Sequence, residues 1–172
     1  MGCILDDQKR LEMVTGLTGR LVEELHHRLR ENLVSVVLYG SYARGTSGPD
    51  SDVDLLIIAK GLPSSSLERQ AFVTPILFEI EHPYRQSLKH TGWFPYISAL
   101  LKTPEEAECV SRIYFDMVEE AKILFEREGF FQAVLQKVQK RLAELGAKRV
   151  QVGKMWYWDL KPDYRPGEIF EI

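Results

Sequence analysis

The chain has 172 residues and is 45% hydrophobic, which predicts a single domain with a buried core. Its net charge of −3 gives none of the overall basicity that marks nucleic-acid-binding proteins, although a local basic patch is compatible with it. No apolar run approaches the roughly 18 residues of a membrane span, so we expect no membrane segment. The two cysteines lack the spacing of a metal site or a disulfide, so we expect a cytoplasmic protein.

The first part of the chain predicts one helix and then two buried strands. Apolar residues recur mostly four positions apart over 6–32, as in an amphipathic helix. The apolar, β-branched stretches 33–39 and 53–59 are typical of strands buried on both faces. The small polar residues 41–51 between them predict a loop with room for one helical turn.

Residues 66–90 allow two interpretations. Their apolar residues fit a helical period, and a run of serines offers an N-cap, but Pro75 and Pro83 would kink a helix. The part that reads ILFEIE also alternates like a strand. We favour the helix. The later elements are, in chain order, a third strand at 94–101, a helix that starts after Thr103 and continues to about Glu120, a short strand at 122–125 and a helix at 130–145.

These elements predict an α+β fold, in which helices pack on a small mixed β-sheet. We assign residues 1–126, with the helix 6–32, to the core of the domain. Residues 127–172 form a C-terminal helix and an aromatic-rich tail, which we expect to be extended and to lie across the same domain.

The stretch GSYARGTSGPDSDVD, residues 40–54, carries the chemistry. Asp52 and Asp54 lie two positions apart at the start of a strand, so both point to one face and repel each other unless a cation lies between them. Mg²⁺ suits one or two carboxylates together with substrate phosphates. Gly40 and Ser41 allow a phosphate to approach the backbone closely, and Arg44 adds a cation in the same loop.

This stretch resembles the signature of the DNA polymerase beta-type nucleotidyltransferase superfamily, especially its minimal nucleotidyltransferases. That signature is Gly-Ser, ten residues and Asp-x-Asp, and here ten residues separate Ser41 from Asp52. Ser51, directly before the first aspartate, also matches. The tail WYWDLKPDYRPGEIFEI is similar to that of a group of prokaryotic, largely archaeal nucleotidyltransferases.

The resemblance implies a nucleotidyltransferase fold and a mechanism. Gly40, Ser41, Arg44 and Ser51 would bind a nucleoside triphosphate, and Asp52 and Asp54 would bind Mg²⁺ or Mn²⁺. The enzyme would transfer a nucleoside monophosphate, AMP from ATP being the leading candidate, to a hydroxyl. The alternative is an antitoxin-type binding module that pairs with a HEPN-type ribonuclease toxin, with weak catalysis or none.

The family's third carboxylate is not identified in the sequence. The expected third strand, FPYISALL, contains no acid. Glu79 and Glu81 are candidates if residues 76–81 form a strand; in a helix, we expect both to be solvated surface charges.

Basic and aromatic side chains gather in the C-terminal third of the chain. We interpret the basic ones mainly as a solvated helix face, with an RNA-binding surface as the alternative, and the aromatic ones mainly as core residues. The basic residues are Lys137, Lys140, Arg141, Lys148, Arg149 and Lys154. The aromatic residues are Trp156, Tyr157 and Trp158, together with Trp93 earlier in the chain, and their alternative role is to stack a base.

Overall fold

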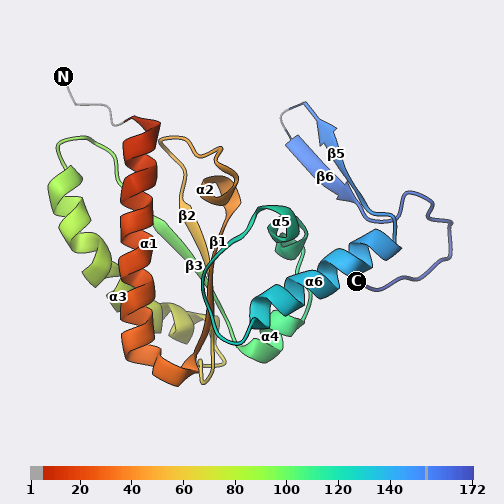
Figure 1. The fold of residues 1–172 in the computed structure, drawn as a ribbon, viewed down its shortest axis with the longest axis horizontal. Helices are drawn as coiled ribbons and strands as arrows, with labels where there is room; N and C mark the ends of the chain where they lie inside the picture. Colours follow the sequence, from red (N-terminus) through yellow and green to blue (C-terminus); the bar gives the residue numbers. More distant parts are fainter. Residues whose placement is uncertain (1–5, 154) are drawn as a thin grey trace.

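A computed structural model describes residues 6–153 and 155–172 (Figure 1). Over these residues, four strands form one mixed sheet in the order β3-β2-β1-β4, and two more form a separate hairpin. The expected α+β architecture is confirmed. The strands are β1 (Leu33–Tyr39), β2 (Val53–Ala59), β3 (Ile97–Lys102), β4 (Lys122–Glu126), β5 (Lys148–Val152) and β6 (Met155–Asp159). The helices are α1 (Asp7–Leu29), α2 (Gly40–Arg44), α3 (Ser66–Leu88), α4 (Pro104–Glu108), α5 (Ile113–Glu120) and α6 (Phe130–Glu144), with a 3₁₀ turn, η1 (Arg30–Asn32), after α1.

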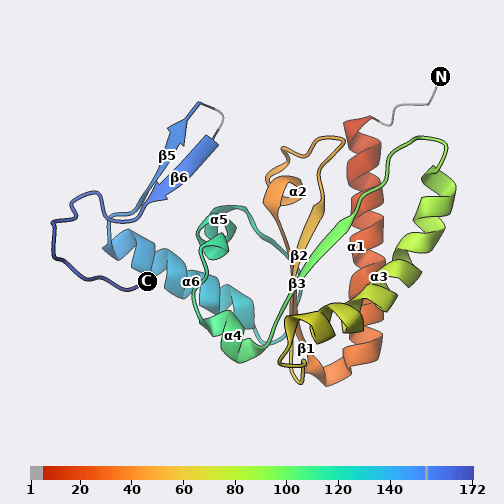
Figure 2. The same cartoon turned by 180° about the vertical axis from the view of Figure 1, so that it is seen from behind.

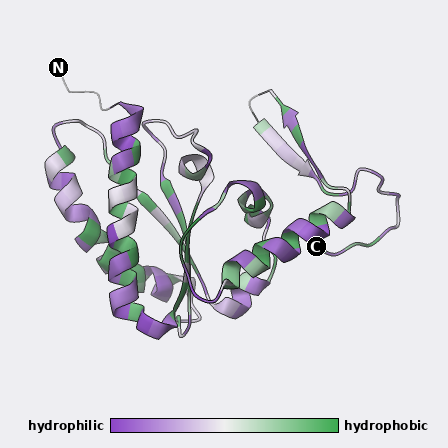
Figure 3. Cartoon of the chain, in the orientation of Figure 1, coloured by the Kyte–Doolittle hydropathy of each residue, from purple (hydrophilic) through white to green (hydrophobic). Residues whose placement is uncertain are grey.

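The helices cover the two faces of the sheet separately. α1 and α3 lie on one face, whereas α4, α5 and α6 lie on the other (Figures 1 and 2). Each face has its own apolar cluster, so the two central strands are buried on both sides. Figure 3 shows the consequence in the hydropathy of the chain, since hydrophobic residues dominate the middle of the sheet.

The predicted N-terminal helix is confirmed as α1 followed by η1. Asp6 caps it, because its side chain accepts a hydrogen bond of 2.8 Å from the Lys9 backbone N–H. The apolar residues at helical spacing face the sheet and are fully buried: Val14, Leu17, Leu21 and Leu25.

Residues 66–88 form one helix, α3, as favoured, although Pro75 and Pro83 lie inside it. Its side chains bond the backbone along the outer edge of β3. Glu81 accepts from Ile97 N–H at 3.3 Å, and Gln70 donates to the Ala99 carbonyl at 3.2 Å. Tertiary packing and these edge contacts therefore outweigh the cost of the prolines, and they shield an edge that another strand could otherwise join.

The helix expected from Thr103 to about Glu120 is wrong in one respect, because it is two helices. Thr103 and Glu106 form a reciprocal capping box that starts α4, but Cys109 is extended and ends the helix. A turn in which Tyr114 N–H donates to the Ser111 carbonyl then starts α5. The break allows both short helices to place residues in one apolar cluster, which a single straight helix would not do.

The tail packs on the domain through Leu160 and Ile172, but it also contains a hairpin that was not expected. Residues 148–159 make the antiparallel hairpin β5–β6 at the far end of α6 (Figure 1). The hairpin contacts α5 through Trp156 and Trp158, whose indole N–H groups both donate to Asp116 Oδ1, at 3.2 and 2.9 Å. Among the described residues, no helix is both long and apolar enough to cross a bilayer.

Candidate active site

The two aspartates of the motif lie at the start of β2. Asp52 directly precedes the strand and is exposed, and Asp54 is its second residue and is half-buried. Val53 and Leu55 belong to the apolar cluster under α1 and α3, and Leu56 belongs to the cluster under α5 and α6. Since side chains alternate along a strand, Asp54 faces the α5 side of the sheet.

Gly40 brings the end of β1 against the Asp54 carboxylate. Tyr39, the last residue of β1, pairs with Asp54 across the two strands, and Gly40 follows with a φ of +71°. A Cβ on Gly40 would overlap Asp54 Oδ2 and lie 3.1 Å from its Cγ. Glycine is therefore needed here twice, for the left-handed backbone and for the approach of the carboxylate.

The electrostatics of this corner favour a cation. Burial raises the pKa of Asp54, the negative charge of Asp52 raises it further, and the Arg44 guanidinium lowers it. A divalent ion between the two carboxylates would remove their mutual repulsion. Among the described residues, no group of three or more His, Cys, Asp or Glu side chains could hold a metal. Two carboxylates nevertheless fit Mg²⁺, which takes its remaining ligands from phosphates and water.

Arg44 is held between the acidic corner and the C-terminal hairpin. Its guanidinium pairs with Glu120 of α5 at 3.1 Å and lies 4.9 Å from the ring centroid of Trp156. Arg149 lies 4.3 Å from the same ring and pairs with Glu120 at 2.6 Å. The expected phosphate ligand thus points toward α5, while its charge still reaches Asp54.

The two serines of the motif have different surroundings. The Ser41 carbonyl accepts from Gly45 and Thr46 N–H, which closes the single turn of α2 next to the acids. The Ser51 hydroxyl accepts from Gly48 N–H at 2.9 Å and so fixes the loop before β2. The corner therefore brings Gly40, Ser41 and Asp54 together, with Ser51 and Asp52 on the adjoining loop.

Neither candidate for the third carboxylate joins the acidic pair. β3 runs parallel to β2 with Ser98 opposite Asp54, so a serine occupies the neighbouring position. Glu79 is an exposed residue of α3 that pairs with Arg28. The expectation that Glu81 would be a solvated charge is wrong, because it is 7% exposed and pairs with Arg85 at 2.8 Å.

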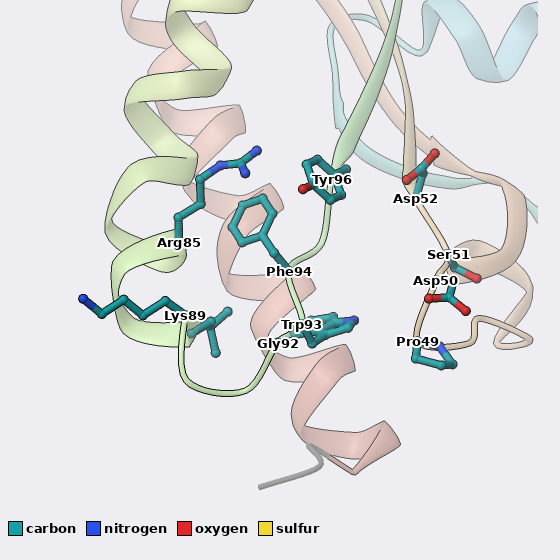
Figure 4. Close-up of a pocket in the computed structure, with 11 residues that line it drawn as sticks. Pro49, Asp50, Ser51, Asp52, Arg85, Lys89, Gly92, Trp93, Phe94 and Tyr96 are labelled. Atoms are coloured by element: carbon teal, nitrogen blue, oxygen red, sulfur yellow. The ribbon is translucent and has the colours of Figure 1, made fainter. Parts of the chain in front are cut away.

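A cavity of about 380 Å³ adjoins the acids, and the sequence analysis missed most of its lining. Asp50 and Asp52 lie on one wall, with Arg85 of α3 and Lys89, directly after that helix, on the opposite wall (Figure 4). The aromatic side chains between the two walls are those of Trp93, Phe94 and Tyr96. Their spacing in the sequence gives no signal, because α3 and the loop that follows it meet the acids only in the folded chain.

The two tryptophans and two arginines of the C-terminal third make contacts within the protein, whereas Lys137, Lys140 and Lys148 are exposed, as expected of a solvated face. Trp158 packs against the apolar cluster under α5 and α6, in agreement with the core interpretation. Arg149 pairs with Glu119 and Glu120, and Arg141 pairs with Glu144. Lys154, another member of the expected basic surface, lies outside the described residues.

A family model for the nucleotidyltransferase domain matches residues 19–142. The chain belongs to this nucleotidyltransferase family. The matched range includes the glycine-serine corner, both aspartates and the cavity beside them. Nucleotidyl transfer is accordingly the class of activity that the domain represents.

Relatives of this nucleotidyltransferase occur among archaea. A Methanocaldococcus jannaschii protein named "Putative protein adenylyltransferase" is 26% identical over 147 residues, which are 84% of this chain and 94% of that protein. A Sulfolobus solfataricus crystal structure named "putative nucleotidyltransferase" aligns with a TM-score of 0.50 at 20% sequence identity. The alignment covers 74% of this chain and 94% of the Sulfolobus chain, and it supports the fold alone. A Shewanella oneidensis complex of a tri-AMPylated HEPN toxin with an MNT antitoxin covers 76% and 92%, at 17% identity, and its TM-score of 0.39 carries no conclusion about this chain.

Proposed function

We propose that this nucleotidyltransferase uses Mg²⁺ to transfer AMP from ATP to a hydroxyl group of a protein. The observation that carries the proposal is the contact between the Gly40 corner and the Asp54 carboxylate, which leaves no room for a side chain on residue 40. That contact places a candidate phosphate-binding backbone directly beside a candidate metal ligand. AMP and a protein acceptor are supported by the name of the Methanocaldococcus jannaschii relative.

Each residue of the corner has a role in this proposal. Asp52 and Asp54 hold the metal ions, which would stabilise the entering and leaving oxygens of an in-line displacement. Gly40 and Ser41 hold the terminal phosphates, and Ser51 keeps the loop before β2 in position. Arg44 supplies positive charge close to Asp54. Positioning and charge neutralisation provide most of the rate in phosphoryl chemistry.

Two differently labelled nucleotides test the proposal. The purified protein is incubated with Mg²⁺, host lysate and ATP labelled either at the α- or at the γ-phosphate. Relative to lysate alone, we expect the added protein to increase stable label on protein only from α-labelled ATP. Asp52→Asn and Asp54→Asn should lose this increase while keeping a folded far-ultraviolet spectrum. An increase from the γ-phosphate, or transfer that survives in both folded variants, would refute the assignment.

A second candidate function, an antitoxin-type binding module, is favoured by the outer face of the hairpin. Met155 and Tyr157 are 73% and 54% exposed, and Val152, beside Met155, is 58% exposed. Alternation along β6 directs these side chains away from α5, where Trp156 and Trp158 are anchored. An apolar face of this kind suits a helical protein partner, and a HEPN-type protein is the partner that we propose for it.

Co-expression with the product of an adjacent helical-protein gene tests this candidate. We expect the wild-type protein to co-purify with that product. The double variant Met155→Ser/Tyr157→Ser should no longer co-purify with it but should transfer AMP at the wild-type rate. Equal recovery with the variant would exclude the hairpin as the interface. An RNA contact through the C-terminal third stays a prediction. Two of the basic residues expected to make it, Arg141 and Arg149, are paired with acids.

A further inference from the structure

The cavity beside Asp52 lies on the opposite flank of the acids from the glycine-serine corner. Gly40 and Ser41 follow β1, and β1 pairs with one edge of β2. The cavity is formed by the loop before β2, the end of α3 and the loop that leads into β3, which pairs with the other edge of β2. Asp52 is the member of the acidic pair that lines the cavity, whereas Asp54, which faces the α5 side of the sheet, does not line it.

In-line displacement requires the attacking oxygen and the leaving group to lie on opposite sides of the phosphorus. If the terminal phosphates occupy the glycine-serine corner, as the proposed function holds, the acceptor approaches from the side of the cavity. Its volume of about 380 Å³ is within the range of small-ligand sites and has room for a side chain and its neighbours.

The chemistry of the lining selects the acceptor. The Arg85 guanidinium lies 4.1 Å from the Phe94 ring centroid and 4.9 Å from that of Tyr96, so the rings hold it in position. Lys89, directly after α3, also lines the cavity and is exposed, and its side chain points away from the aspartates in the view of Figure 4. Arg85 Nε and Trp93 Nε1 are buried donors with no hydrogen-bond partner among the described residues. A ligand rich in acceptor oxygens would supply what these donors lack.

We propose that this cavity is the acceptor site, and that it receives a hydroxyl-bearing residue flanked by acidic side chains in a protein segment. The inference rests on the proposed function for the position of the triphosphate. A protein segment rather than RNA follows from the proposed function, whose acceptor is a protein. Asp50 and Asp52 line the same cavity, so negative charge on the acceptor is favoured only on the side of Arg85 and Lys89. Arg85 Nη2 already pairs with Glu81 at 2.8 Å, so a short acidic segment would meet the Arg85 Nε and Trp93 Nε1 donors together with the exposed Lys89.

Matched peptides test the proposal. Three peptides carry one Ser, Thr or Tyr between glutamates, and three counterparts have lysines in place of the glutamates. We expect the wild type to adenylylate at least one acidic peptide with a kcat/KM about tenfold above its lysine counterpart. Lys89→Glu should abolish or reverse this preference. Lys60→Glu, the same charge change on an exposed residue beyond the far end of β2, should leave it unchanged.

Calorimetry without nucleotide separates failure of the acceptor site from failure of the proposed function. Binding of an acidic peptide that Lys89→Glu weakens and Lys60→Glu does not would support the cavity even if no AMP were transferred. Equal use and equal binding of acidic and lysine peptides would overturn the acceptor site while leaving adenylyl transfer intact. Transfer to host RNA in preference to every peptide would overturn it as well.

Discussion

Replacing Gly40 with alanine should slow transfer by on the order of 100-fold, because it moves one carboxylate. The new Cβ would overlap Asp54 Oδ2, so the carboxylate would have to move by on the order of 1 Å. A displacement of that size at a reacting centre costs on the order of 100-fold in rate. The left-handed backbone at residue 40 adds about 1–2 kcal/mol of instability for any residue with a side chain.

Gly45 provides a matched control at the other end of the same turn. Its φ of +74° is nearly that of Gly40, but nothing lies within 4 Å of the position that its Cβ would take. Gly45→Ala should therefore carry the same backbone penalty without moving Asp54. Both variants should melt about 2–8 °C below the wild type, on the scale of 2–4 °C per kcal/mol for a chain of this size.

The assay is transfer of α-labelled AMP at saturating Mg²⁺, measured beside thermal unfolding of each variant. We expect Gly40→Ala to lose on the order of 100-fold in transfer and Gly45→Ala to stay close to the wild type. If both variants lose similar activity, backbone strain is responsible, and if neither does, the contact between Gly40 and Asp54 has no part in the reaction. Either result would refute the reasoning.

Three further predictions concern titration and stability. Burial and Asp52 raise the pKa of Asp54, so ionising this carboxyl destabilises the folded state. In the absence of Mg²⁺, Asp54→Asn should therefore melt at a higher temperature than the wild type at pH 7. The unfolding curves of the two proteins should converge as the pH falls below 3.8, the ordinary pKa of the group. The Arg69 guanidinium lowers the pKa of Glu106 to about 2, so Glu106→Gln should cost about 1–2 kcal/mol in urea unfolding at pH 7, and that cost should disappear as the pH falls from 4.5 toward 2. Asp116→Ala should release both indoles of the hairpin and shift tryptophan emission to the red. Asp116→Asn keeps an acceptor oxygen and should shift the emission less. Equal shifts would show that these hydrogen bonds do not hold the hairpin.

Local patterns predicted most of the fold. The period of α1 and the buried character of β1 and β2 are set by residues close together in the chain, so their bounds agree with the structure to within a few residues. The break between α4 and α5 has no comparable local signal, since it is the shared apolar cluster that requires both helices to turn. The hairpin has one local signal, Gly153, which lies between β5 and β6 and adopts a φ of +63°.

Part of the candidate site also has a local pattern in the sequence, and part of it does not. Gly40, Ser41, Asp52 and Asp54 lie within 15 residues of one another, and their spacing alone indicated the corner that the folded chain forms. Arg44 has the expected place in the sequence but pairs with Glu120, which is 76 residues away. No local pattern gives that distant partner. The same holds for Arg85 and Lys89, which reach the cavity only in the folded chain.

Metal binding in the presence of nucleotide tests the central claim most directly. Electron paramagnetic resonance can count Mn²⁺ ions bound to the protein with a non-hydrolysable ATP analogue, for the wild type and for Asp54→Asn. The paired carboxylates predict that Mn²⁺ binds the wild type only when the analogue is present, and that the folded variant binds it much more weakly. Equal Mn²⁺ binding by the two proteins would contradict the role assigned to Asp54 and, with it, the proposed site.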